Sequence, residues 1–280
     1  MHQIIALAAS VVPLLVAGTP AGTATYKDDH LQAALVSAQM ALVPGQTALL
    51  GVYLQHAPHW HTYWINPGDS GLPTRLQWTL PPGYRTGDIQ WPTPQRLTQG
   101  DIHDFGYIGD ALLPVPLLVP ADAKPGTTVH LQVEAKWLVC HERCIPGKAH
   151  LSLELPIRGE TGQDPRTASL FEQARIRQPR DVAWKANAHL RGDTVAVSLA
   201  GAGIPADAKL DAFAQTTQVV ANAPPHIERH GNRIDLRFAK NDYYASAPSR
   251  LTLVLTAAHG KQRSAYRVDL PFAAGDRPKP

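Results

Sequence analysis

The chain has 280 residues, of which 44% are hydrophobic and 18% are charged, and its formal net charge is +3. This composition is normal for a globular protein, and the length suffices for two domains of ordinary size. The basic residues are scattered and form no run, which argues against binding of nucleic acid or another polyanion. The 25 prolines disfavour long helices and favour short strands joined by turns.

The N-terminus has the pattern of an export signal. Residues 4–16 are almost wholly apolar, and Gly22 and Ala24 occupy the −3 and −1 positions of a cleavage site before Thr25. No Lys or Arg precedes the apolar run, and a buried N-terminal element is the alternative. We expect residues 1–24 to be a signal peptide and the protein to be exported. We also expect the mature protein to be soluble, since no later segment has the roughly 20 apolar residues of a membrane helix.

The first predicted domain, residues 25–157, is all β. Strands are expected at residues 48–54 and 76–80, and apolar side chains alternate with polar ones from Val129 to Val139 and again from Ala149 to Leu155. The aromatic and proline-rich residues 56–66 are expected to form a long loop that ends in a turn at residues 67–71.

A linker with one short helix is predicted at residues 158–180. Asp164 is the expected N-cap and Pro165 the first helical residue. The helix could bury one apolar stripe, made of Leu170, Phe171, Ala174 and Ile176.

The second predicted domain covers residues 181–274. A strand is expected at residues 195–199, and hairpins at 227–238 and 251–270 with turns at 230–232 and 259–261. Short strands with turn signals at this spacing indicate an antiparallel sandwich. Residues 275–280 resemble a linker and are expected to be a tail.

Cys140 and Cys144 are the two cysteines of the chain, and they lie at the junction of two predicted strands. An even cysteine count in an exported chain indicates a disulfide, and a three-residue connection can bring the Cα atoms within about 6 Å. So short a loop stabilises the fold by only about 2 kcal/mol, against more than 4 for a loop of about a hundred residues. A reachable disulfide in a short loop is instead typical of exchangeable bonds.

Three interpretations of the pair remain open on the residues alone: disulfide exchange, a local structural staple, and a metal site. His141, Arg143 and Lys148 would favour a nearby thiolate, whereas Glu142 opposes it. Cys140, His141 and Cys144 are soft ligands suited to Cu(I) or Zn. Further histidines of the same domain stand in predicted loops: His56, His59, His61 and His103.

A longer pattern resembles a known family. Residues 60–74, WHTYWINPGDSGLPT, are followed in order by Trp-Pro-Thr-Pro at 91–94, Phe-Gly-Tyr at 105–107, Leu-Val-Cys at 138–140 and Cys-Ile-Pro at 144–146. Together they resemble the N-terminal periplasmic domain of DsbD-type thiol:disulfide interchange proteins, most closely the suppressor of copper sensitivity protein B branch. The resemblance covers roughly residues 45–157, and the second domain matches loosely the extra immunoglobulin-like domain of that branch.

The resemblance implies two immunoglobulin-like sandwiches and a protein-disulfide reductase. Cys144 would form the mixed disulfide with a thioredoxin-fold or other oxidised periplasmic partner, and Cys140 would be the resolving cysteine. A cap loop within residues 103–107, with Asp104, Phe105 and Tyr107, would cover the pair until a partner docks. We expect no cofactor and a monomer.

Two departures from the family pattern stand out. The best-known DsbD proteins space these cysteines more widely, so the short loop is closer to the copper-sensitivity branch. These 280 residues also contain neither a membrane electron-transfer domain nor a thioredoxin motif, so a fused or separate thioredoxin-like donor is expected to supply electrons. The alternative functions are a copper-binding or copper-tolerance module using Cys140, His141 and Cys144, and an interaction module with a structural disulfide.

Overall fold

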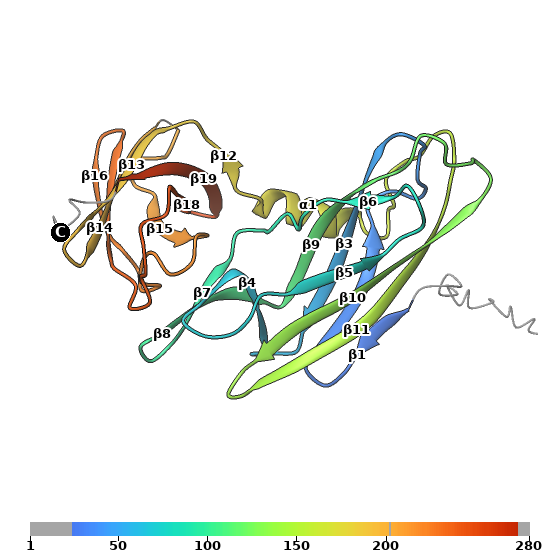
Figure 1. Cartoon of the computed structure of the whole chain (residues 1–280), viewed down its shortest axis with the longest axis horizontal. Coiled ribbons are helices and arrows are strands. Elements are labelled where there is room, and N and C mark those ends of the chain that lie inside the picture. Colours follow the sequence, from blue (N-terminus) through green and yellow to red (C-terminus); the bar gives the residue numbers. More distant parts are fainter. Residues whose placement is uncertain (1–23, 202, 274–280) are drawn as a thin grey trace, which may run out of the picture.

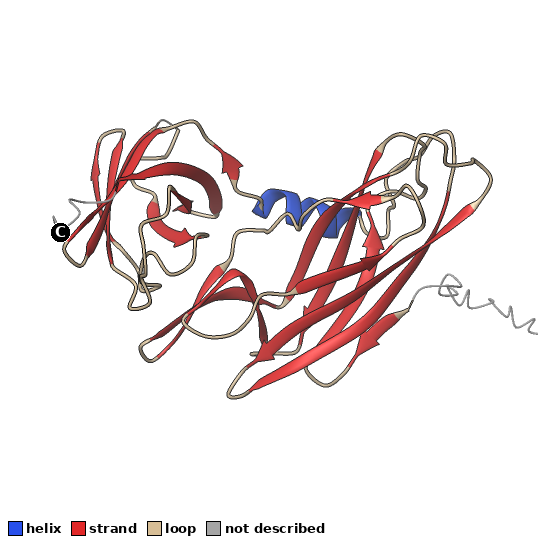
Figure 2. Cartoon of the chain, in the orientation of Figure 1, coloured by secondary structure: helices blue, strands red, loops and turns tan. Residues whose placement is uncertain are grey.

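The computed structural model describes residues 24–201 and 203–273, which are almost entirely β-structure (Figure 2). The strands form mainly antiparallel sheets that build two immunoglobulin-like sandwiches, one at each end of the molecule in Figure 1. This confirms the predicted fold class. The predicted tail and the predicted signal peptide, apart from Ala24, lie outside the described residues. In the described part of the chain, no helix has the length and apolar character needed to cross a bilayer.

The first sandwich consists of two sheets. One sheet contains, in spatial order, β1 (Thr25–Lys27), β2 (Leu31–Ser37), β3 (Thr47–His56), β9 (Asp110–Leu118) and β6 (Arg85–Thr86). The other contains β11 (Cys144–Pro156), β10 (Thr128–Cys140), β4 (His61–Gly68), β8 (Ile102–Ile108) and β7 (Gln95–Gln99), and β5 (Arg75–Thr79) pairs with β10. Buried aliphatic and aromatic side chains of both sheets form one core between them.

Strand β10 has the predicted alternation, because its apolar side chains from Val129 to Val139 are buried. The predicted loop at residues 56–66 is wrong, because most of this segment belongs to β3 and β4. Thr62, Tyr63 and Trp64 are all buried. Strand β4 is therefore covered on both faces and lacks the alternation that identifies a half-exposed strand.

Helix α1 (Ala168–Arg177) connects the sandwiches (Figure 1). It begins at Ala168 rather than at the predicted Pro165, and Thr167 is its N-cap. Asp164 instead accepts a hydrogen bond from the backbone N–H of Arg166 at 2.9 Å and pairs with that guanidinium, which forms a turn ahead of the helix. The predicted apolar stripe is also shorter, since Phe171 and Ala174 are buried near β9 but Ile176 is 62% exposed.

The second sandwich is one continuous sheet that folds over its own core. Its strands are, in spatial order, β15 (Lys209–Ala214), β18 (Arg250–His259), β19 (Gln262–Ala273), β13 (Lys185–Arg191), β14 (Thr194–Ala200), β17 (Arg233–Ala239) and β16 (His226–His230), with β12 (Arg180–Asp181) beside β19. Both predicted hairpins are confirmed. The pairings of β12 and β13 with β19 are parallel, which departs from the antiparallel prediction.

The two sandwiches contact each other where β4, β7 and β8 approach β15. The ring of Phe105 in β8 lies between those of Trp64 and Phe213, with centroid distances of 6.4 and 5.2 Å. Arg96 of β7 lies over both phenyl rings and forms a bidentate ion pair with Asp211 of β15. The core of the first sandwich thus continues into the second.

Candidate redox site

The two cysteines flank the turn of the long β10–β11 hairpin. Antiparallel pairing runs without interruption from Thr128 opposite Pro156 to Cys140 opposite Cys144. Residues 141–143 form the turn, closed by a hydrogen bond from the His141 N–H to the Arg143 carbonyl at 3.2 Å. The sulfurs are joined in a disulfide, and the two Cα atoms are 4.1 Å apart.

The two cysteines differ sharply in exposure. Cys140 is 2% exposed. It follows the core residue Val139, so its side chain points to the opposite face of β10, and it pairs with His61 of the neighbouring strand β4. Cys144, the first residue of β11, is exposed. A thiolate that approaches from solvent can therefore reach the Cys144 sulfur, while the Cys140 sulfur is shielded by the sandwich.

The side chain of Tyr63 contacts the disulfide at Cys144. Its ring is 1% exposed, and its hydroxyl oxygen lies 3.7 Å from the Cys144 Sγ and 3.3 Å from the His61 Nε2. Burial raises the pKa of the Tyr63 hydroxyl, with an opposing contribution from a hydrogen bond with Ser70. The phenol therefore stays protonated at neutral pH and remains able to donate to sulfur.

Two histidines of this region are held in their neutral forms. Burial lowers the pKa of His61, and the nearby His141 lowers it further, while Asp104 opposes both. Burial also lowers the pKa of His56 to about 4. The His56 Nδ1–H donates to the Gly109 carbonyl at 2.6 Å, which leaves the Nε2 to accept from the Thr62 hydroxyl at 2.9 Å.

A group of rings flanks the hairpin turn. His30 stacks on Trp60 with ring centroids 4.0 Å apart, and Trp60 lies 5.9 Å from His141. His59 is 5.6 Å from His141 and has a positive φ of 73°. These rings form an aromatic and polar surface near the exposed residue Cys144.

The segment predicted as a cap loop, residues 103–107, is not a loop but part of strand β8, which pairs with both β4 and β7. Asp104 is 7% exposed and accepts hydrogen bonds from the N–H and hydroxyl of Ser70 at 2.8 and 2.7 Å. Phe105 is 1% exposed and packs against the second sandwich, and Tyr107 is buried and donates to the Pro92 carbonyl at 2.8 Å. A covering role for Phe105 would require its ring to leave this packing, and it stays a prediction.

The comparisons with known proteins agree on the first domain. Residues 29–156 match the family model described as thiol:disulfide interchange protein DsbD, N-terminal. This segment is thus a domain of the DsbD N-terminal type. No curated protein sequence matches the chain.

In fold, both sandwiches of the chain have a counterpart. The N-terminal periplasmic domain of ScsB from Proteus mirabilis superposes with a TM-score of 0.64 at 18% sequence identity, covering 89% of this chain and 97% of that one. A chimeric titin Z1Z2 gives 0.22 at 14% identity, covering 87% and 98%. The yeast GGA1 GAE domain gives 0.28 at 12% identity, covering 47% and 97%.

The predicted modulators of the DsbD-type site lie in the turn itself. His141 and Arg143 are both exposed, and the Arg143 side chain has no bonding partner among the described residues. For the alternative metal site, no three His, Cys, Asp or Glu side chains in residues 24–201 and 203–273 are arranged to hold a metal ion. His56 and His61 are engaged with Thr62 and Tyr63 instead.

The sequence pattern indicated no role for Tyr63 at the disulfide and pointed to His61 only as a possible metal ligand. Both point to the same face of β4, since they are two residues apart in a strand. The alternation His61–Tyr63 within the motif at residues 60–74 is a signal that could have indicated their role. It was obscured by the expectation of a loop in this segment.

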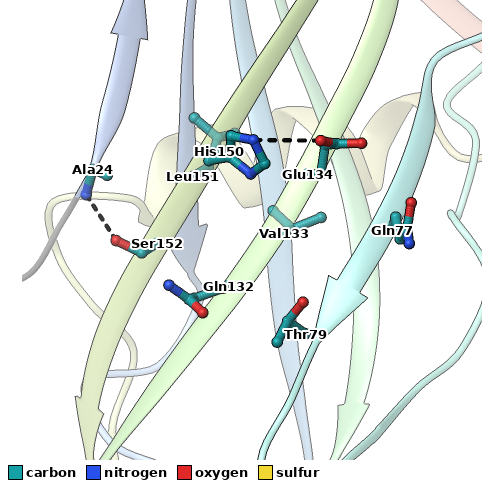
Figure 3. A pocket seen from close by; sticks show the side chains of 9 residues that line it. All are labelled: Ala24, Gln77, Thr79, Gln132, Val133, Glu134, His150, Leu151 and Ser152. Atoms are coloured by element: carbon teal, nitrogen blue, oxygen red, sulfur yellow. Dashed lines mark hydrogen bonds and ion pairs between the residues drawn. The ribbon is translucent and has the colours of Figure 1, made fainter.

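A pocket of about 290 Å³ lies elsewhere on the same sandwich (Figure 3). Polar side chains of β5, β10 and β11 line it, including Gln77, Glu134 and His150. The His150 Nε2 lies 3.4 Å from a Glu134 carboxylate oxygen, and the two residues are opposite each other in the β10–β11 pairing. Glu134 is six residues along β10 from Cys140, about 20 Å at the rise of a strand, so this pocket is separate from the disulfide.

Proposed function

We propose that this chain is a periplasmic thiol–disulfide exchange module that acts as a protein-disulfide reductase through Cys140 and Cys144. Membership of the DsbD N-terminal family supports the reaction class, and the likeness to a periplasmic domain is in keeping with the compartment. The observation that carries the proposal is the contrast between an exposed Cys144 and a Cys140 that is 2% exposed. Such asymmetry lets one sulfur meet a partner while the other is kept for resolution.

Reduction of a partner starts from the dithiol form. The Cys144 thiolate attacks one sulfur of the partner's disulfide, the other partner sulfur leaves as a thiolate, and a mixed disulfide forms. The Cys140 thiolate then attacks the Cys144 sulfur and releases the second partner sulfur. Two electrons have moved to the partner, whose thiolates take up two protons, and the Cys140–Cys144 disulfide is the product.

Tyr63 assists the chemistry at Cys144. Its hydroxyl, 3.7 Å from the Cys144 Sγ, donates a hydrogen bond to the thiolate and so favours the charged form. The raised pKa of the phenol keeps the proton on oxygen during this contact. His61 holds the hydroxyl from its other side at 3.3 Å.

The partners of the module are thioredoxin-like proteins, as donors and as acceptors. The rings of Trp60 and His141 and the 44% exposed Ile108 offer a mixed apolar and polar surface next to Cys144. Ile108 lies opposite His61 in the β4–β8 pairing, so it is on the same end of the sandwich as the disulfide. The donor is a thioredoxin-like domain, fused or separate, that draws on a membrane electron-transfer domain, and the module works as a monomer.

The decisive experiment is to trap the mixed disulfide. A Cys140→Ala variant, expressed with its export signal, should accumulate a covalent adduct with thioredoxin-fold proteins that is cleaved by reductant, because the resolving thiolate is missing. A Cys144→Ala variant should give none, since its remaining cysteine is buried. Equal adducts with both variants, or none with either, would refute the assignment.

A further inference from the structure

Two contacts between the sandwiches involve residues 66–72, which comprise the last three residues of β4 and the turn after it and are here called the 66–72 loop. The Asn66 Nδ2 donates to the Ala214 carbonyl of β15 at 2.7 Å in a fully buried hydrogen bond. The Asn222 Nδ2 donates to the Asp69 Oδ1 at 2.9 Å, and Asn222 itself is 7% exposed. Two residues of the 66–72 loop are therefore fastened to the second sandwich.

The same loop supports Tyr63. A Cβ atom on Gly71 would lie 2.3 Å from the Tyr63 ring, so the loop backbone rests directly on that ring. The Asp69 Oδ2 accepts the His103 N–H at 2.7 Å, and Asp104 holds Ser70 through two hydrogen bonds. The 66–72 loop thus packs against the Tyr63 ring and fixes its position.

Arg96 fixes the second-sandwich side of this contact. Its guanidinium donates to the backbone carbonyls of Ala212 and Asn222 while it pairs with Asp211 at 2.8 Å, and its side chain is 10% exposed. Asn222 therefore accepts a hydrogen bond from Arg96 through its backbone carbonyl and donates one to Asp69 through its side-chain amide. Both partners belong to the first sandwich. Arg96 and Asn222 are mostly buried and each is bonded to more than one group, so these contacts favour one arrangement of the two sandwiches.

We propose that the second sandwich is a brace that positions the Tyr63 hydroxyl against Cys144 through the 66–72 loop, with Asn222 and Arg96 as positioning residues. The inference deepens the proposed function and depends on it for its purpose. The chain of contacts runs from Asn222 to Asp69, along the loop to Gly71, and from Gly71 to the Tyr63 ring. It gives the second domain a role in the reactivity of a sulfur that it does not touch.

The test uses the full chain, reduced with dithiothreitol, and follows alkylation of Cys144 by iodoacetamide against pH. In Asn222→Ala, the midpoint of the alkylation profile should shift to higher pH by as much as about one unit, which is the size expected when a thiolate loses one hydrogen-bond donor. The double variant Asp69→Asn/Asn222→Asp exchanges donor and acceptor, so it should restore the wild-type profile. Asn232→Ala, in the exposed turn between β16 and β17, is the matched control and should change nothing.

A shift in Asn222→Ala that the double variant reverses supports the brace. A profile unchanged in Asn222→Ala, in a protein that is still folded, overturns it. Thermal unfolding of each variant separates lost stability from altered reactivity, because a merely structural contact would lower stability and leave the profile in place. Since alkylation needs no protein partner, failure of the brace is distinguishable from failure of the proposed function, which the trapping experiment tests.

Discussion

Replacement of Tyr63 by Phe tests the proposed site at a single atom. The ring stays in its buried place against Gly71, and the hydroxyl 3.7 Å from the Cys144 Sγ is lost. One hydrogen bond to a charged acceptor contributes about 1.5 kcal/mol, which corresponds to a rise of about one unit in the pKa of the Cys144 thiol.

The two consequences of that rise oppose each other. At a pH below the thiol pKa, the thiolate fraction falls about tenfold, but the more basic thiolate is about threefold more nucleophilic, so the rate should fall about threefold. At a pH above the thiol pKa of both proteins, the fractions are equal and Tyr63→Phe should react about threefold faster. The two pH–rate profiles should therefore cross.

The assay is the reaction of the reduced protein with a small aromatic disulfide, followed by absorbance in a Cys140→Ala background where Cys144 is the sole thiol. Tyr107→Phe is the matched control, because it removes a buried hydroxyl from the adjacent strand β8 that donates to the Pro92 carbonyl rather than to sulfur. Superimposable profiles for Tyr63→Phe and its parent would refute the reasoning.

Three further outcomes are expected. Phe105→Ala should lower the free energy of unfolding by about 3 kcal/mol in urea titrations, because it leaves a cavity at the domain contact. If the disulfide of this variant reacts with small thiols at the wild-type rate, the capping role of Phe105 is excluded. Gly71→Ala should give the same pH–rate profile as Tyr63→Phe in the reaction with the small aromatic disulfide. The added Cβ would displace the Tyr63 ring, and the φ of +80° at this position is strained for alanine. As the pH falls from 6.5 to about 4, the free energy of unfolding should decrease by roughly 3 kcal/mol, because His56 takes up a proton in the unfolded chain but not in its buried place. In His56→Gln, the free energy of unfolding should lack this dependence on pH.

The sequence is most informative where a strand has one exposed face. Strand β10 and the hairpins of the second sandwich follow from their alternation and from turn residues such as Gly231 and Gly260, both with positive φ. Strand β4 could not be identified in this way, because burial of both faces removes the period of two. The start of α1 was misplaced because Asp164 caps a turn rather than the helix.

The cysteine pair follows from its spacing, but the surroundings of the pair do not. The contact of Tyr63 with Cys144 joins residues 81 positions apart, and that of Asp69 with Asn222 joins residues 153 apart. Such contacts depend on the pairing of β4 with β8 and β10 and on how the sandwiches meet, which no local pattern encodes. The cap loop that the resemblance implied at Asp104 and Phe105 could not be tested from sequence for the same reason, since the packing partner of Phe105, Phe213, belongs to the other domain.

A redox module must keep its fold in both states, and the position of this disulfide explains how it can. The bond closes a loop between residues four apart, at the end of a hairpin already held by pairing from Thr128–Pro156 onward. The chain-entropy contribution of so short a loop is about 2 kcal/mol. Folding therefore lowers the reduction potential of the disulfide by only about 40 mV relative to the same pair in an unfolded chain. Urea unfolding of the oxidised and dithiothreitol-reduced protein should therefore give free energies that differ by no more than about 2 kcal/mol. A difference of 4 kcal/mol or more, or loss of structure on reduction, would mean that the bond is a staple on which the sandwich depends and not one that can open and close during exchange.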